Sequence, residues 1–261
     1  MTGAAGTGPR LSGSPWFPYA AEHSDAATRL FCLPYAGGGW ALFRDWQEQL
    51  GPDVHAVPVK LPGRAERFHE PAVDRMDLLA DQLAVEVAPL LDRPYALFGI
   101  SMGALLAFET AARLVDRGLR PPDRLFAASC RAPREPFGTT PVHGLPDAAL
   151  IEVLTRLTAT PPQLLANAEL MRLVLPTVRA DFACTETYVR PDRAPLPVPV
   201  TAIRGRDDDT LTEAMVSGWR AETSAGFEQL EVTGDHFLVH GDQSELTALV
   251  RRRLPGGAGN R

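Results

Sequence analysis

Short apolar runs alternate along this chain with segments that have the period of a helix. The runs that predict strands are residues 30–33, 54–59, 95–100, 125–129, 198–203 and 230–232. The segments that predict helices are residues 41–50, 76–91, 102–115, 212–219 and 244–254. Parallel strands need long crossover connections, which are usually helices. The alternation therefore predicts an α/β fold with a mostly parallel central sheet and helices on both of its faces.

One stretch, about residues 136–197, contains no convincing strand and interrupts this alternation. It holds two stripes of apolar residues at helical spacing: Leu150, Val153, Leu154 and Leu157, then Leu170, Leu173 and Val174. Pro176 should kink the second of these helices. We interpret the stretch as a helical lid over a pocket. The alternative is a set of extra helices packed on the core.

The two ends of the chain have a different composition from the middle. Residues 1–28 are rich in Gly, Ala, Ser and Pro, which predicts a flexible leader, with Trp16 and Phe17 docking on the body. Residues 255–261 predict a flexible tail. We therefore expect one domain over residues 29–254. The N-terminus lacks the basic start and apolar run of a signal peptide.

Charge and cysteine content exclude several classes of protein. The chain has 26 Lys plus Arg and 32 Asp plus Glu, a formal charge of −6, without the basic clusters that nucleic-acid binding needs. Its most apolar stretch, residues 95–108, is too short to span a membrane. The three cysteines show no CxxC spacing, so we expect neither disulfides nor a zinc site, and a reducing cytoplasm. No group of side chains has the spacing of metal ligands, so we infer no metal and no cofactor.

The central motif is Gly99-Ile100-Ser101-Met102-Gly103. GxSxG is common by chance, but here it directly follows a predicted strand and directly opens a predicted helix, which is the setting of a nucleophilic serine. Glycines let such a sharp turn close, and the N–H of Met102 would point to where an oxyanion forms. The competing interpretation is a tight turn with a solvated serine.

A nucleophilic serine needs a base, and the best placed histidine is His236, in the loop between the last strand and the last helix. His240, four residues later, is its rival. The histidine in turn needs an acid at the end of a late strand, between the serine and itself. Asp207, Asp208 and Asp209 all follow the strand at 198–203. The spacing from Gly205 favours Asp208, with Asp207 as the second choice.

A second oxyanion donor is expected in the loop after an early strand, and residues 34–39, Pro-Tyr-Ala-Gly-Gly-Gly, form such a loop. Its glycines would let the backbone approach a substrate closely. A phosphate-binding loop is the alternative, but neither Gly-Lys-Ser/Thr nor GxGxxG follows.

With these residues in view, the sequence resembles the type II thioesterases, the free-standing editing hydrolases of polyketide synthases and nonribosomal peptide synthetases. The resemblance runs from about Leu30 to Leu254. Its motifs are Leu33-Pro34-Tyr35-Ala36-Gly37-Gly38, Leu61-Pro62-Gly63-Arg64, Gly99-Ile100-Ser101-Met102-Gly103-Ala104, Leu175-Pro176-Thr177-Val178-Arg179-Ala180-Asp181 and Gly234-Asp235-His236-Phe237.

The resemblance implies an α/β-hydrolase fold with a helical lid inserted after the sixth strand. It implies a triad of Ser101, His236 and Asp208, with the backbone amides of Ala36 and Met102 as the oxyanion hole. The implied substrate is an acyl thioester on the phosphopantetheine arm of an acyl or peptidyl carrier protein, from which aberrant acyl groups are removed. Nothing indicates an obligate interface, so we expect a monomer.

Two residues depart from the pattern of that family. Ile100 stands where a histidine usually precedes the nucleophile, which should leave the triad intact but alter local polarity and acyl preference. Asp209 stands where a proline usually follows the acid, which weakens the assignment of Asp208.

Other functions share much of this pattern. A general carboxylesterase or lipase has the same fold and triad, because these do not set the leaving group. A chain-terminating cyclising thioesterase normally lies at the end of a synthetase. A hydrolase-fold binding protein with a dead site usually lacks a triad member, and none is missing from this sequence.

Overall fold

The computed structural model describes residues 14–17, 25–138, 140–157 and 159–255. Within them, six strands form a single sheet in the order β2-β1-β3-β4-β5-β6, and all five pairings are parallel. The strands are β1 (Thr28–Leu33), β2 (Val54–Pro58), β3 (Tyr95–Ile100), β4 (Arg124–Ala128), β5 (Val200–Gly205) and β6 (Phe227–Val232). The predicted α/β class is therefore confirmed.

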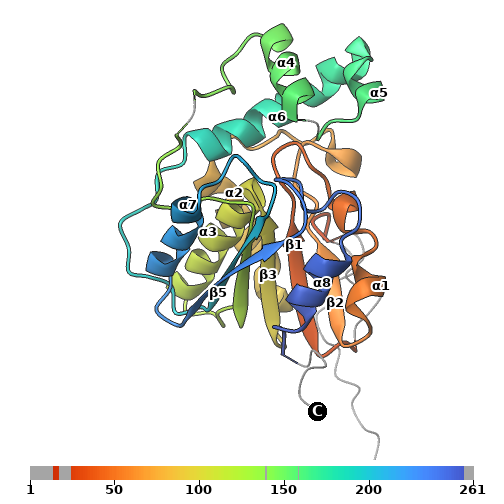
Figure 1. Cartoon of the computed structure of the whole chain (residues 1–261). Coiled ribbons are helices and arrows are strands. Elements are labelled where there is room, and N and C mark those ends of the chain that lie inside the picture. Colours follow the sequence, from red (N-terminus) through yellow and green to blue (C-terminus); the bar gives the residue numbers. More distant parts are fainter. Residues whose placement is uncertain (1–13, 18–24, 139, 158, 256–261) are drawn as a thin grey trace, which may run out of the picture.

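Helices cover both faces of this sheet (Figure 1), and each face has its own apolar core. On one side lie α1 (Trp46–Leu50) and α8 (Ser244–Arg251), where Trp46 packs against Phe98 of β3. On the other lie α2 (Met76–Val87), α3 (Met102–Asp116) and α7 (Glu213–Ser217). Short 3₁₀ turns complete the set at Trp40–Phe43, Ala65–Arg67, Ala88–Leu90 and Gly218–Glu222.

Three further helices lie across the carboxyl ends of the strands (Figure 1). They are α4 (Asp147–Leu157), α5 (Pro162–Leu165) and α6 (Ala168–Glu186), and they fill the interval between β4 and β5. Leu150 and Leu154 of α4 pack with Met171, Leu175 and Val178 of α6 in a small apolar cluster of their own. We call α4, α5 and the first half of α6, as far as Leu175, the helical cap.

The structure corrects two expectations about this region. The insertion follows the fourth strand of the described chain, because the sheet has six strands in all and only two come after the insertion. The buried face of α6 is also not the predicted one, since Leu170 and Leu173 are 45% and 51% exposed. This part of α6 is apolar around most of its circumference, so only the packing against α4 decides which face is buried.

Several boundaries also differ from the prediction. Strand β6 starts at Phe227, three residues before the apolar run at 230–232 from which it was predicted. It is an edge strand, and charged residues such as Glu228 and Glu231 interrupt its apolar pattern. Helix α6 includes Pro176 and extends past it to Glu186, so a kink at this proline does not end the helix. The docking of Trp16 and Phe17 on the body is as expected: both are buried in the core, and Phe17 lies against Phe31 of β1. Among the described residues, no helix combines the length and apolar character that crossing a membrane requires.

We expect Gly103→Ala to prevent correct folding of the turn at the start of α3. A Cβ there would lie 2.3 Å from the carbonyl oxygen of Leu33 and 2.7 Å from that of Pro34, and backbone atoms cannot move aside as side chains do. The variant should lose more than the roughly 1–3 kcal/mol typical of an overpacked core. Thermal and urea unfolding would measure this loss. Gly144→Ala, where a Cβ meets no atom within 4 Å, is the matched control and should unfold like the wild type.

Candidate active site

Ser101 occupies a strained turn between β3 and α3. Its φ of 53° lies in the region that glycine favours, which is rare for other residues. Its N–H donates to the carbonyl of Ala128 at 2.9 Å, which ties the turn to β4. A Cβ on Gly99 would lie 2.1 Å from the carbonyl oxygen of Gly103, so the turn closes only with glycine at position 99. The hydroxyl is thereby held at the carboxyl end of the central strand.

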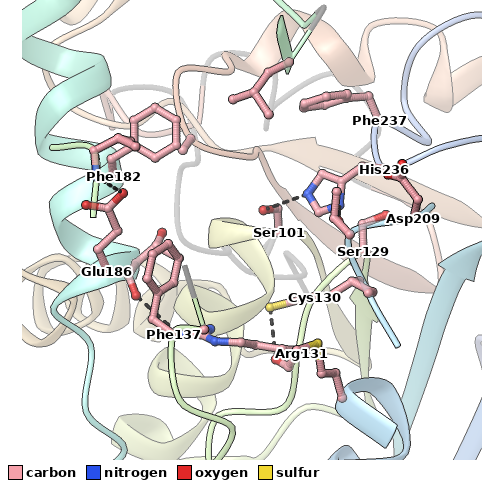
Figure 2. Close-up of a pocket in the computed structure, with 18 of the residues that line it drawn as sticks. Ser101, Ser129, Cys130, Arg131, Phe137, Phe182, Glu186, Asp209, His236 and Phe237 are labelled. Carbon is pink, nitrogen blue, oxygen red and sulfur yellow. Dashed lines mark hydrogen bonds between the residues drawn. The ribbon is translucent and has the colours of Figure 1, made fainter. Parts of the chain in front are cut away.

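The structure brings His236 to this serine (Figure 2) and Asp208 to the far side of the same ring. Nε2 of His236 lies 3.3 Å from Oγ of Ser101, and its Nδ1 lies 2.9 Å from Oδ2 of Asp208. A carboxylate can only accept, so Nδ1 carries the ring proton and Nε2 is left as the acceptor that faces the serine. The three side chains form one continuous line of hydrogen bonds.

Asp208 is the aspartate of the three that faces the histidine. It is 1% exposed, whereas Asp207 and Asp209 are exposed. Burial by itself would raise the pKa of Asp208, but the hydrogen bonds from His236 and Thr210 outweigh burial and hold that pKa below its usual value. Asp208 therefore stays ionised at neutral pH. The substitution of Asp209 for the usual proline does not displace it.

Close contact between two loops sets this geometry. A Cβ on Gly205 would lie 2.3 Å from the carbonyl oxygen of Asp235, so the glycine allows the loop after β5 to touch the loop that carries His236. The N–H of Asp207 donates to the carbonyl of Gly234 at 3.0 Å and joins the same two loops. Thr210 was not predicted, but its N–H and hydroxyl both donate to Oδ1 of Asp208, at 2.9 and 2.6 Å.

The rival histidine has another partner. Nε2 of His240 lies 2.8 Å from the hydroxyl of Tyr35, and its ring stacks on Phe237 with an interplanar angle of 20°. Burial lowers the pKa of His240. His143 pairs with Glu186, a residue of α6. Neither histidine has a hydrogen bond to Ser101 in the described part of the chain.

The two backbone amides predicted to form the oxyanion hole are those of Met102 and Ala36. Met102 is the first residue of α3, and Ala36 lies in the loop after β1. Neither N–H donates to any acceptor among the described residues, and Ala36 borders the cavity that contains Ser101. The field of the α3 dipole adds positive potential at Met102. No cluster of three or more His, Cys, Asp or Glu side chains in the described ranges could hold a metal ion.

The cavity has two chambers that meet at Ser101 and His236. The larger chamber, about 500 Å³, also has polar groups such as Arg131 and Glu186 in its wall (Figure 2). The smaller, about 190 Å³, lies under the cap and is lined by apolar side chains, among them Leu154, Met171 and Val178. Arg131 was not predicted from the sequence. It is buried, and its guanidinium donates to the carbonyls of Pro136 and Thr185 at 3.3 and 3.4 Å.

The residue before the nucleophile does not contact this cavity. Ile100 is fully buried and packs with Phe98 in the core on the α1 and α8 side of the sheet. Side chains alternate along a strand, and Ile100 shares a face with Phe98. An apolar residue therefore suits this position without contacting the acyl group.

Comparison with known proteins agrees with this geometry. The thioesterase domain family model matches residues 28–254. A relative named linear gramicidin dehydrogenase LgrE, from Brevibacillus parabrevis, is 37% identical over 94% of this chain and 94% of its own length. The structure of RedJ, a thioesterase of the prodiginine pathway of Streptomyces coelicolor, superposes with a TM-score of 0.83 at 39% identity, covering 89% of this chain and 88% of RedJ.

A second solved structure with a similar fold is that of a type II thioesterase. YbtT, of the yersiniabactin NRPS/PKS biosynthetic pathway, has a TM-score of 0.81 at 32% identity and covers 90% of this chain and 96% of its own. The family match spans all six strands of the described sheet and the complete Ser101, His236 and Asp208 arrangement. The chain therefore belongs to the thioesterase family, with an α/β-hydrolase fold, and its near relatives are the type II thioesterases of polyketide and nonribosomal peptide pathways.

Proposed function

We propose that Ser101 is the nucleophile of a two-step thioester hydrolysis, with His236 as general base and Asp208 as the acid that orients it. The single observation that carries this proposal is the unbroken line of hydrogen bonds from Asp208 through His236 to Ser101, which ends inside a cavity. A serine hydroxyl is a poor nucleophile alone and becomes effective when a base takes its proton.

In the first step, Oγ of Ser101 bonds to the thioester carbonyl carbon while its proton passes to Nε2 of His236. The carbonyl oxygen becomes an oxyanion, which the N–H groups of Ala36 and Met102 bind. The imidazolium is stabilised by the ionised Asp208. The C–S bond then breaks, and the sulfur leaves as a thiol after taking the proton from His236.

In the second step, water replaces the thiol. His236 takes a proton from the water, whose oxygen attacks the acyl-serine, and Ser101 leaves with that proton restored. The products are a free carboxylic acid and the regenerated serine. A thioester needs less help with its leaving group than an amide does, which suits a site with one histidine and no metal in the mechanism.

We propose that the acyl group arrives on the phosphopantetheine arm of an acyl or peptidyl carrier protein, and that hydrolysis removes stalled or aberrant chains. The relatives named above come from such pathways. The smaller chamber under the cap suits an acyl chain. The larger chamber is also mostly apolar, but Arg131 and Glu186 in its wall offer polar groups to the amides of the arm. An extended arm of this kind reaches about 15–20 Å, by ordinary chain dimensions.

The helical cap is proposed to act as the gate for that substrate. Leu150 and Leu154 pack on Met171 and Leu175 within the cap, and on the body through Val178 in the second half of α6. Arg179 of that half also pairs with Asp147 at the start of α4. The second half of α6 is different, since Cys184 belongs to the main core. Opening would therefore move α4, α5 and the start of α6, on the slow timescale of lid motions.

Two alternatives keep the same triad. A carboxylesterase would differ in its leaving group, and a chain-terminating thioesterase in the nucleophile that resolves the acyl-serine. The family match favours thioester hydrolysis over the first. No dehydrogenase activity is proposed, although the relative LgrE has that word in its name, because the dinucleotide pattern GxGxxG is absent from this sequence.

We also propose a cytoplasmic monomer that needs no cofactor. Cys32, Cys130 and Cys184 are all free and buried, which suits a reducing compartment. Burial raises the pKa of each of these thiols, so they are unreactive at neutral pH.

A serine-directed fluorophosphonate should label the protein once, at Ser101. Ser101→Ala should abolish both the mass increase and the hydrolysis of an acyl-N-acetylcysteamine, measured by intact-protein mass spectrometry and thiol release. Ser129→Ala is the matched control, because Ser129 is a second serine of the same cavity, and this variant should still be labelled. Labelling that survives Ser101→Ala would remove the nucleophile assignment.

Asp208→Asn should lower kcat by about 10⁴, the loss seen when the triad acid of a serine protease is replaced by asparagine. Thr210 donates twice to Oδ1, so the NH2 of the asparagine would face Nδ1 of His236 and donate to it. The ring proton then moves to Nε2, which is no longer available as a base. Asp207→Asn and Asp209→Asn are matched controls in the same loop and should stay within about 3-fold of the wild type, as exposed positions usually do. If Asp207→Asn is the crippled variant, the acid has been assigned to the wrong residue.

Leu150→Ala should loosen the cap and favour its open state. The side chain is fully buried and belongs to the α4–α6 cluster, and such truncations cost about 2–5 kcal/mol in a core. We expect kcat/KM for an acyl-carrier protein to rise relative to that for the matching acyl-N-acetylcysteamine. Leu173→Arg, on the exposed side of α6, should leave the ratio unchanged. Equal losses on both substrates in Leu150→Ala would show that the cap shapes the pocket without gating it.

A further inference from the structure

Three segments that the sequence shares with type II thioesterases meet at one buried ion pair. They are the loop after β1, the Leu61–Arg64 segment after β2, and the second half of α6. Asp181 of α6 is 1% exposed, and the two terminal nitrogens of Arg64 each donate to one of its oxygens at 2.7 Å. The mechanism above uses neither residue.

The same pair holds the loop after β1 at two successive residues. The N–H of Gly37 donates to Oδ2 of Asp181 at 2.7 Å, and Nη1 of Arg64 donates to the carbonyl of Gly38 at 2.9 Å. Gly37 has a φ of +78°, a conformation that other residues rarely adopt. The residue immediately before it is Ala36, whose N–H is the proposed oxyanion donor. Fixing the peptide between Ala36 and Gly37 therefore restricts how the Ala36 amide can turn.

The Arg64–Asp181 pair has no net charge, which suits a position close to the proposed oxyanion hole. Asp181 binds Gly37, the residue next to the proposed oxyanion donor Ala36. A lone carboxylate so near the oxyanion would raise the energy of the negative charge that forms in the transition state. Arg64 cancels that charge and completes the hydrogen bonding of Asp181 with bidentate geometry. The pair thus offers an acceptor for the loop amide without adding net charge beside the reacting oxygen.

We propose that Asp181 and Arg64 are positioning residues for hydrolysis, which act through the loop to aim the N–H of Ala36 at the oxyanion. This inference rests on the proposed function, because it takes Ser101 as the nucleophile and Ala36 as a donor. It also links α6 to catalysis, since the second half of that helix has to stay in place for the hole to be formed.

A purely structural role would be to anchor α6, and a neighbouring residue provides the control for it. Thr177 lies one turn before Asp181, and its hydroxyl donates to the carbonyl of Gly63 at 2.6 Å. Its side chain makes no hydrogen bond to the loop after β1 in the described part of the chain. Thr177→Val therefore removes an anchor of α6 and leaves both bonds to Gly37 and Gly38 in place.

The test compares a ligand that forms an oxyanion with one that does not. Oγ of Ser101 adds to the carbonyl carbon of an alkyl trifluoromethyl ketone, its proton passes to His236, and the ketone oxygen becomes an oxyanion in the hole. The alkyl alcohol of the same chain length binds without this reaction. Inhibition constants for both ligands are measured with kcat, KM and the thermal midpoint for each variant.

Asp181→Ala should lower kcat by about 10–100-fold, since a displaced catalytic group can cost about 10². Affinity for the ketone should fall by the same factor, while KM and affinity for the alcohol stay within about 3-fold, because ground-state binding does not use the hole. Asp181→Asn keeps an oxygen for Gly37 and should lose less kcat and less ketone affinity than Asp181→Ala.

Arg64→Met leaves an uncompensated carboxylate. It should lose more kcat and more ketone affinity than the double variant that combines Arg64→Met with Asp181→Asn. Thr177→Val should lower the thermal midpoint without changing the ratio of the two affinities.

Two results would overturn the proposal. One is an Asp181→Ala variant that is folded and keeps wild-type ketone affinity and kcat. The other is equal loss of ketone and alcohol affinity in the Asp181 variants, which would indicate a general anchor. If Asp181→Ala does not fold, the comparison of Arg64→Met with its double variant decides the question. Hydrolysis that survives Ser101→Ala would instead refute the proposed function, so the two failures are distinguishable.

Discussion

The rest of the active site depends on how closely the turn at Ser101 packs against the strand next to it. Gly99 and Gly103 have no room for a Cβ, because the backbone of the turn and of Leu33 and Pro34 fills that space. This contact brings the start of α3 against the end of β1, which puts the Met102 amide and the loop containing Ala36 on either side of one serine. A positive φ at Ser101 is the strain that this arrangement requires.

A second set of close contacts holds His236 and Asp208. Gly205 lets the loop after β5 touch the loop after β6, and Asp208 is buried there with its hydrogen bonds supplied by His236 and Thr210. A buried carboxylate without such partners would be costly. The pKa of Asp208 is lowered despite its burial because those partners favour the ionised form. The triad geometry and the stability of this corner therefore depend on the same bonds.

The helices at the carboxyl ends of the strands consist of a part joined to the body and a cap. The second half of α6 belongs to the body, through Cys184 in the core and Asp181 in its pair with Arg64. The cap packs through the Leu150 cluster, which also includes Val178 of the body half of α6, and it covers the smaller chamber. Such a division lets a cap move while the backbone amides around Ser101 stay fixed, a requirement of any preorganised oxyanion site.

The sequence by itself determined the α/β class, the order of the elements and the candidate residues Ser101, His236 and Asp208. Each of these follows from local patterns: apolar runs that alternate with helical periods, glycines that flank a serine, and an aspartate and a histidine that follow late strands. Ala36 and Met102 were identifiable because the resemblance and the turn pointed to their amides. Local pattern is informative here because backbone sterics and burial act over a few residues.

Only the tertiary structure decided which of three adjacent aspartates is buried and which face of α6 is covered. It also placed Thr210, Arg131 and the Arg64–Asp181 pair around the site. Asp207, Asp208 and Asp209 are chemically identical, and what separates them is the direction in which each side chain leaves a loop held by Gly205 and Gly234. Leu170, Leu173 and Leu175 are likewise equivalent in sequence, and α4 selects among them. These choices depend on contacts between residues far apart in the chain, and no local pattern encodes such contacts.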